Sequence, residues 1–195
     1  MKIQLFFVCL IVLFSSTAKA QEKGRFAQHE VGIKLSFSFI QEKLSGDEGY
    51  YQPVLFQGYF GWHLGKTENI TEKTGHFIAY LEPQINPVFI SGQFSDIEFG
   101  CNFGARYDLE LGLNNRLFWA IGTGPHYITV ETQKQHRGYI FSDNFIMGWQ
   151  HRWEGQMYST LQYHFRHISN ANLMKPNQGI DNHFFTLGIS KILDY

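Results

Sequence analysis

The sequence predicts an all-β protein, an eight-stranded antiparallel transmembrane β-barrel of the bacterial outer-membrane type. Apolar and polar residues alternate with a period of two along most of the chain, which is the pattern of strands and not of helices. Aromatic residues make up 17% of the chain, with 19 Phe, 10 Tyr and 4 Trp. Such a content suits a barrel with an apolar outer band and aromatic girdles.

The first 20 residues have the features of a secretory signal peptide. Lys2 supplies the positive charge, residues 3–14 form an apolar segment, and Ala18, Lys19 and Ala20 form an A-x-A cleavage site. The apolar segment is short for a membrane-spanning helix. We therefore expect residues 1–20 to be removed on export and residues 21–195 to form a single barrel domain.

Charge and cysteine content argue against a nucleic-acid-binding protein and against a disulfide-stabilised fold. Loss of Lys2 and Lys19 with the signal peptide changes the net charge from −1 to −3, which argues against a nucleic-acid partner. Cys101 is the one cysteine left after residue 20, so the sequence predicts no internal disulfide. The mean hydropathy of −0.23 does not exclude a membrane barrel, because alternation hides the apolar face from an average.

Alternation and turn signals divide the chain into eight segments, each about long enough to cross a bilayer at a tilt. In the fourth segment, Ile97, Phe99 and Cys101 share one face, whereas Glu98 and Asn102 share the other. Pro83 interrupts the third segment, which we predict to be the weakest strand. The eight predicted strands are 31–39, 54–64, 76–86, 97–109, 116–130, 138–150, 156–169 and 183–195.

An even number of strands places both ends of the barrel on the periplasmic side. The chain closes on the aromatic Tyr195 of an alternating strand, which resembles the signal read by the barrel-assembly machinery. With this orientation the connection 170–182 is extracellular and the tight turn 112–115 is periplasmic. The polar segment 66–75 would then be a periplasmic loop of unusual length.

Polar residues gather where the seventh predicted strand ends. His167 and Ser169 are two residues apart, so on a strand they share a face, and their alternation places that face toward lipid. Polar groups facing lipid are costly unless they pair or act chemically. Asp181 begins the next strand across a hairpin and can reach His167. The three residue types suit a nucleophile (Ser169), a general base (His167) and an orienting acid (Asp181).

The segment between these strands offers hydrogen-bond donors. Asn170 and Asn177 flank the three residues, and their amides could stabilise an oxyanion. Gly179 would allow the connection to turn tightly back toward the strand.

These residues together resemble the lipid A 3-O-deacylase (PagL) family. The resemblance is carried by His167-x-Ser169-Asn170-Ala171, then Asn177-x-Gly179, then an acidic residue at 181, and it is specific over residues 165–181. It implies an outer-membrane enzyme that hydrolyses the 3-O-linked acyl chain of lipid A, with lipopolysaccharide and outer-membrane lipid as its partners. It implies no cofactor, and it leaves a homodimer open. The chain departs from the family in one respect, since the acid is usually Glu and here is Asp181.

Each of these residues alone has a simpler interpretation. His167 alone suits an interfacial histidine, Ser169 a strand end, Asp181 a rim charge, and Asn170 and Asn177 ordinary turn chemistry. Their joint spacing favours the catalytic interpretation. We predict no metal site, because His164 and His167 face opposite sides of one strand.

Two other function classes compete with the esterase. One is a non-catalytic barrel with a structural, adhesive or channel role, although an eight-stranded barrel is too narrow for a wide channel. The other is a phospholipase or palmitoyltransferase on the same scaffold. The lipid products separate these activities.

Overall fold

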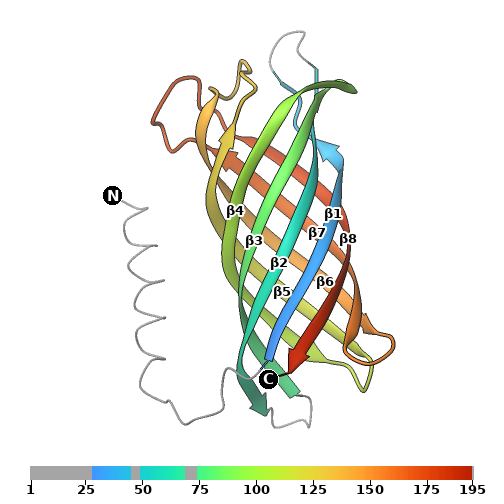
Figure 1. Ribbon diagram of the computed structural model, residues 1–195. Helices are drawn as coiled ribbons and strands as arrows, with labels where there is room; N and C mark the ends of the chain where they lie inside the picture. The colour runs from blue at the N-terminus through green and yellow to red at the C-terminus, as the bar shows by residue number, and fades with distance from the viewer. Residues whose placement is uncertain (1–27, 45–48, 69–73, 195) are drawn as a thin grey trace.

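Eight antiparallel strands form the computed structural model, which describes residues 28–44, 49–68 and 74–194 (Figure 1). The strands are β1 (Gln28–Gln41), β2 (Tyr51–Glu68), β3 (Thr74–Ile90), β4 (Gln93–Glu110), β5 (Asn115–Ile128), β6 (Gly138–Arg152), β7 (Met157–Ser169) and β8 (Ile180–Asp194). Each strand pairs with the next, and β8 pairs with β1, so the sheet closes. The predicted eight-stranded antiparallel barrel is confirmed. The predicted signal peptide, residues 1–20, lies outside the described residues.

The two-residue period of each strand sorts its side chains between lipid and the barrel interior. In β6 the apolar Phe145, Met147 and Trp149 are exposed on the outside, while Asn144 and Gln150 are buried inside. Large apolar side chains point outward from every strand. The described residues contain no helix that is long and apolar enough to cross a membrane.

The prediction that the third strand is the weakest is wrong. β3 runs without interruption through Pro83 and pairs with β4 from Gly75 to Ile90, including Pro83 with Cys101. The ladder between β3 and β2 instead has a gap between the Leu81 and Gln84 pairs. The missing N–H of Pro83 is therefore accommodated on one side of the strand alone.

The predicted loop 66–75 is also wrong, because β2 extends to Glu68 and β3 begins at Thr74. Only residues 69–73 separate the two strands, and they lie outside the described part of the chain. At other boundaries, β5 ends at Ile128 and not at residue 130, and β8 begins at Ile180. Tyr195 also lies outside the described residues.

Charged side chains in the barrel interior are paired across the lumen. Arg166 of β7 forms an ion pair with Glu98 of β4, whose carboxylate also accepts hydrogen bonds from Tyr51 (3.0 Å) and Asn86 (3.0 Å). His126 Nδ1 lies 2.8 Å from the same carboxylate. Buried charges need such partners because they have left water. This network joins strands on opposite sides of the barrel.

A second network lies nearer the end of the barrel at which β1 begins and β8 ends. Arg106 donates to both oxygens of Asp108, at 2.5 and 2.6 Å, and lies 3.3 Å from Glu30. Arg116 also donates to Asp108, at 3.2 Å. The side chains of these networks fill the interior, so the barrel offers no wide channel.

The opposite end of the interior is closed by an apolar cluster that we call the apolar cap. Its members come from six strands and two connections, and they are Leu44, Tyr51, Val88, Ile128, Val130, Ile140, Ile168 and Ile180. Ile168 and Ile180 face each other directly in the β7–β8 ladder. The cap therefore fixes the ends of the two strands that carry the predicted site residues.

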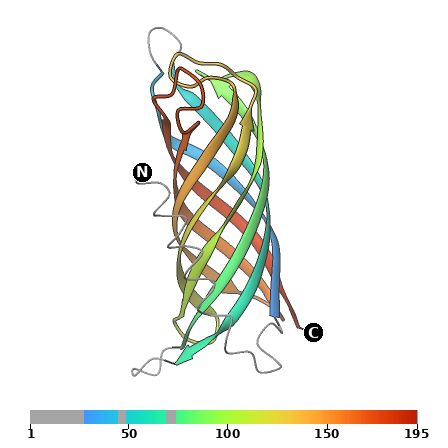
Figure 2. The same ribbon diagram turned by 90° about the vertical axis from the view of Figure 1, so that its left-hand side faces the viewer.

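The start of β1 and the end of β8 lie at one end of the barrel, and the β5–β6 and β7–β8 connections lie at the other (Figures 1 and 2). The connections at the first end include the short turns 111–114 and 153–156. Outer-membrane barrels have short periplasmic turns and longer extracellular loops. We therefore assign the β7–β8 connection to the extracellular end, as the sequence predicted.

Replacing Glu98 by Ala should destabilise the barrel, because it leaves the buried guanidinium of Arg166 without its carboxylate. Breaking a buried ion pair by removing one partner costs about 3–5 kcal/mol. The free energy of unfolding in urea, measured on barrels refolded in lipid, tests this. Glu154→Ala in an exposed turn is the control, and equal stability of the two variants would contradict the prediction.

Candidate active site

His167 and Asp181 form a hydrogen-bonded pair on the outer surface of the barrel. The two residues lie directly opposite each other in the β7–β8 ladder, and His167 Nδ1 is 2.6 Å from Asp181 Oδ1. Their side chains are 38% and 47% exposed. Because side chains of directly opposed residues start close together, the short Asp side chain is sufficient to reach the imidazole.

Ser169 lies on the same outer face, two residues further along β7 and at its extracellular end. Side chains in these positions start roughly 6–7 Å apart along a strand. Within the described part of the chain, no hydrogen bond joins Ser169 to His167. A nucleophile and its base are often further apart in the free enzyme than in the complex with substrate.

The residues beside the pair are held inside the barrel. Arg166 donates to Ser142 at 2.8 Å as well as to Glu98, and Ile168 is fully buried in the apolar cap. Since side chains alternate along a strand, anchoring Arg166 and Ile168 inside fixes His167 and Ser169 outside.

Gly179 lies against the imidazole and is required there for two reasons. Its φ of +78° favours glycine, and a Cβ at this position would be 2.5 Å from His167 Cε1 and 3.1 Å from Nε2. The connection between β7 and β8 thus passes close to the edge of the ring that carries Nε2. This agrees with the tight turn expected at Gly179.

Asn170 and Asn177 organise the same connection. The Asn170 backbone N–H donates to Asn177 Oδ1 (2.9 Å), and the buried Asn170 side chain donates to the Met174 carbonyl (2.8 Å). Asn177 Nδ2 has a long contact of 3.4 Å with Asn172 Oδ1. A side-chain amide has two N–H donors, so each residue retains donor capacity.

The connection is braced by the neighbouring extracellular loop between β5 and β6. Gln135 pairs with Asn177 in an isolated β-bridge. Around it, His136 N donates to the Pro176 carbonyl (2.9 Å) and Gln178 N donates to the Lys134 carbonyl (2.8 Å). These contacts fix the connection that carries the two Asn residues.

The structure adds two residues that the sequence analysis missed. Asp143 of β6 lies directly opposite His167, and Thr123 of β5 lies directly opposite Asp143 and donates to it at 2.7 Å. Thr123, Asp143, His167 and Asp181 therefore form one polar row across four strands of the lipid-facing surface. Asp143 shares the outward parity of Phe145, and a charge on an apolar face was the signal that could have found it.

A second hydrogen-bonded pair lies below this row on the same face. Tyr163 Oη and His183 Nδ1 are 2.6 Å apart, and Phe165 lies directly opposite His183 in the ladder. Phe39 packs on Phe185 with ring centroids 4.4 Å apart. The polar row thus borders an aromatic surface on the side of the membrane interior.

The described residues contain no group of three or more His, Cys, Asp and Glu side chains that could hold a metal ion. His164 points into the barrel, where Nε2 lies 2.7 Å from Asn144 Oδ1, whereas His167 points outward. The two histidines face opposite sides of β7.

Comparison with known proteins assigns a family to this arrangement. The family model described as lipid A 3-O-deacylase (PagL) matches residues 27–190. The chain belongs to this family. The predicted family resemblance and the outer-membrane localisation are therefore confirmed. A search of the curated proteins gives no match.

The crystal structure of the outer membrane enzyme PagL has the same fold as the family member described here. The two chains are 14% identical, the match covers 80% of this chain and 97% of that one, and the TM-score is 0.55. Two further matches have lower TM-scores. Neisserial surface protein A has 7% identity, coverage of 84% and 94%, and a TM-score of 0.46. The Yersinia pestis outer membrane protein Ail has 12% identity, coverage of 86% and 99%, and a TM-score of 0.42.

Gly179→Ala should reduce deacylation of lipid A, the reaction for which the family is named, because the new methyl group displaces the His167 ring. A misplacement of about 1 Å can cost roughly 100-fold in rate. Mass spectrometry of lipid A from membranes with equal amounts of barrel measures the loss.

Gly112→Ala is the matched control, since Gly112 also has a positive φ of +112° but no atom lies within 4 Å of its Cβ position. Equal losses in the two variants would show that backbone strain, and not the contact with His167, causes the effect.

Proposed function

We propose that this protein is a serine esterase that removes the 3-O-linked acyl chain of lipid A in the outer leaflet. The observation that carries the proposal is the His167–Asp181 hydrogen bond on the lipid-facing surface, with Ser169 next to it at the extracellular rim. An ester at the boundary between headgroup and acyl chains would meet these side chains directly. Membership of the lipid A 3-O-deacylase family supports the substrate.

In the proposed first step, Ser169 Oγ attacks the ester carbonyl carbon while His167 Nε2 takes the hydroxyl proton. Asp181 accepts the Nδ1–H of His167, which leaves Nε2 free to act as the base and stabilises the imidazolium that forms. The carboxylate of Asp143 on the other side of His167 adds a second negative charge near this cation. The tetrahedral intermediate collapses as His167 returns the proton to the sugar oxygen.

In the second step, water attacks the acyl carbon on Ser169 while His167 takes a proton from it. The bond between the acyl carbon and Ser169 Oγ then breaks, and His167 returns the proton to Ser169 Oγ. The products are a free fatty acid and lipid A with one acyl chain fewer. We assign the oxyanion contacts to the amides of Asn170 and Asn177, which the braced connection holds beside the site. Preorganised donors of this kind typically contribute about 10²–10³ in rate.

A non-catalytic barrel is the second candidate, and the outer surface argues against it. A barrel without chemistry gains nothing from two carboxylates and a histidine in one row that faces lipid, where charged groups are costly. The filled interior also offers no route for solutes.

Ser169→Ala should abolish deacylation and leave the barrel intact, because the residue faces outward at a strand end. Lipid A from cells that express the wild type should lack one hydroxyacyl mass, whereas the variant should give unmodified lipid A. Heat-dependent migration of the folded barrel in gels verifies assembly. Deacylation by an assembled Ser169→Ala barrel would rule out the proposed nucleophile.

Asp181→Asn should lower the rate strongly, by up to about 10⁴-fold, since an amide cannot hold the imidazole in the same tautomer or stabilise its cation. Asp181→Glu is the conservative comparison and should retain most of the activity, because it keeps the charge. Rates are measured on purified enzyme with lipid A in mixed micelles. Similar rates for the Asn variant and the wild type would remove Asp181 from the mechanism.

The homodimer left open by the family resemblance stays a prediction. The mass of the protein in a detergent complex, measured by light scattering, tests it.

A further inference from the structure

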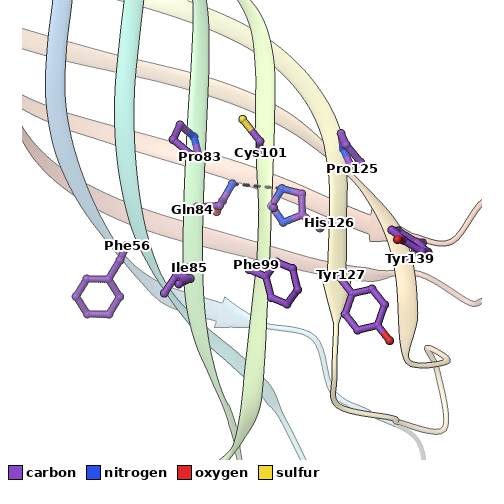
Figure 3. Close-up of a pocket in the computed structure, with 11 residues that line it drawn as sticks. Phe56, Pro83, Gln84, Ile85, Phe99, Cys101, Pro125, His126, Tyr127 and Tyr139 are labelled. Atoms are coloured by element: carbon purple, nitrogen blue, oxygen red, sulfur yellow. Dashed lines mark hydrogen bonds between the residues drawn. The ribbon is translucent and has the colours of Figure 1, made fainter.

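A groove of about 690 Å³ lies on the outer surface of the barrel, away from the catalytic pair (Figure 3). One wall is a row of large side chains from five consecutive strands, which are Phe56, Ile85, Phe99, Tyr127 and Tyr139. Each of them lies directly opposite the next in the ladders between neighbouring strands. The wall therefore runs across the strands as one continuous ridge.

The floor of the groove is the adjacent row of small outward side chains. It consists of Pro83, Cys101 and Pro125, which Figure 3 shows side by side next to the ridge. Gln84 and His126 also border the groove, but their side chains are buried in the barrel and are joined by a contact of 3.4 Å. The groove is lined mainly by apolar atoms.

The floor row leads to the proposed nucleophile. Pro125 lies directly opposite Phe141 in the β5–β6 ladder, and Phe141 lies directly opposite Ser169 in the β6–β7 ladder. Strands are about 4.8 Å apart, so Ser169 is roughly 10 Å from Pro125 and roughly 14 Å from the strand of Cys101 along this row.

The same row also descends into the membrane. Ser169 is the last residue of β7 and Phe141 lies near the extracellular end of β6, whereas Cys101 and Pro83 lie at the middles of β4 and β3. A chain that begins at Ser169 and follows the row therefore passes from the rim toward the centre of the bilayer. This is the course of an acyl chain whose ester lies at the membrane surface.

We infer that the groove binds the distal part of the acyl chain whose ester lies at Ser169, and so sets the preference of the enzyme for long chains. This inference rests on the proposed esterase function. The ridge and the floor supply apolar contacts that only a chain long enough to pass Phe141 can make. An extended chain rises roughly 1.2 Å per bond. A butanoyl chain therefore ends before Pro125, whereas a tetradecanoyl chain reaches Cys101.

A kinetic experiment tests this with p-nitrophenyl butanoate and p-nitrophenyl tetradecanoate in detergent micelles. Cys101→Phe fills the floor and should lower kcat/KM for the tetradecanoate at least roughly tenfold, mainly through KM, since even one methylene can change specificity by 10–200-fold. It should leave the butanoate within about twofold of the wild type, in the range of surface changes that do not touch a substrate.

Ala105→Phe is the matched control, because Ala105 lies on the same face of β4 but outside the groove. It should change neither substrate. An unchanged rate of tetradecanoate cleavage in an assembled Cys101→Phe barrel would overturn the inference, as would equal losses in the two Phe variants.

A binding experiment keeps the groove testable if the esterase proposal fails. In the Ser169→Ala barrel, tetradecanamide should slow the reaction of Cys101 with an N-alkyl maleimide several-fold, and butanamide should not. A thiol at position 105, in the Cys101→Ala, Ala105→Cys double variant, should react at the same rate with either amide. Equal protection of both positions by tetradecanamide would show general coating by the amphiphile and would exclude a specific groove.

Protection of Cys101 without ester cleavage by the wild type would remove the esterase proposal and leave the groove as an acyl-chain site. Ser169-dependent ester cleavage without protection of Cys101 and without chain-length selectivity would support the esterase proposal and overturn the groove as an acyl-chain site.

Discussion

Charge pairing inside the barrel is the constraint on which the rest of the structure depends. A guanidinium or carboxylate withdrawn from water must find an opposite charge, and here the partners come from distant strands, such as Arg166 of β7 with Glu98 of β4. These pairs cross the lumen and fill it. A filled interior leaves no room for a lipid, so a lipid molecule can meet this barrel only at its outer wall.

The interior network also positions that chemistry. Strand side chains alternate, so each anchored inward residue determines where its outward neighbours stand. Arg166 and Ile168 flank His167 in the sequence, and both side chains are buried inside the barrel. Arg166 belongs to the ion-pair network, and Ile168 belongs to the apolar cap. On the facing strand β8, the buried side chain of Ile180 directs its neighbour Asp181 to the outer face in the same way. The His167–Asp181 contact is therefore a consequence of ladder register and cap packing.

Much of the fold could be predicted from the sequence because the rule for a barrel strand is local. Alternation identified all eight strands and placed His167 and Ser169 on the outer face. The prediction that Pro83 weakens its strand was wrong, since a proline disturbs a ladder only on the side where its N–H would have donated. The alignment of Asp143 and Thr123 with His167, and the groove floor at Cys101, depend on the register between neighbouring strands. Register is set by packing across the barrel and cannot be predicted from the sequence of a single strand.

Ladder register also explains how the short side chain of Asp181 reaches His167, at the position where the family resemblance implies Glu. A carboxylate must reach Nδ1 of a histidine on the neighbouring strand, and the reach required depends on the offset between the two residues. Here Asp181 is directly opposite His167, and the 2.6 Å contact needs no longer side chain. Asp143 lies directly opposite His167 in the other ladder of β7, and its carboxylate accepts a hydrogen bond from Thr123. His167 thus lies in the ladder between two acidic residues, Asp143 on β6 and Asp181 on β8. Charged residues on a surface that faces lipid are costly, so their alignment in one row points to a chemical role.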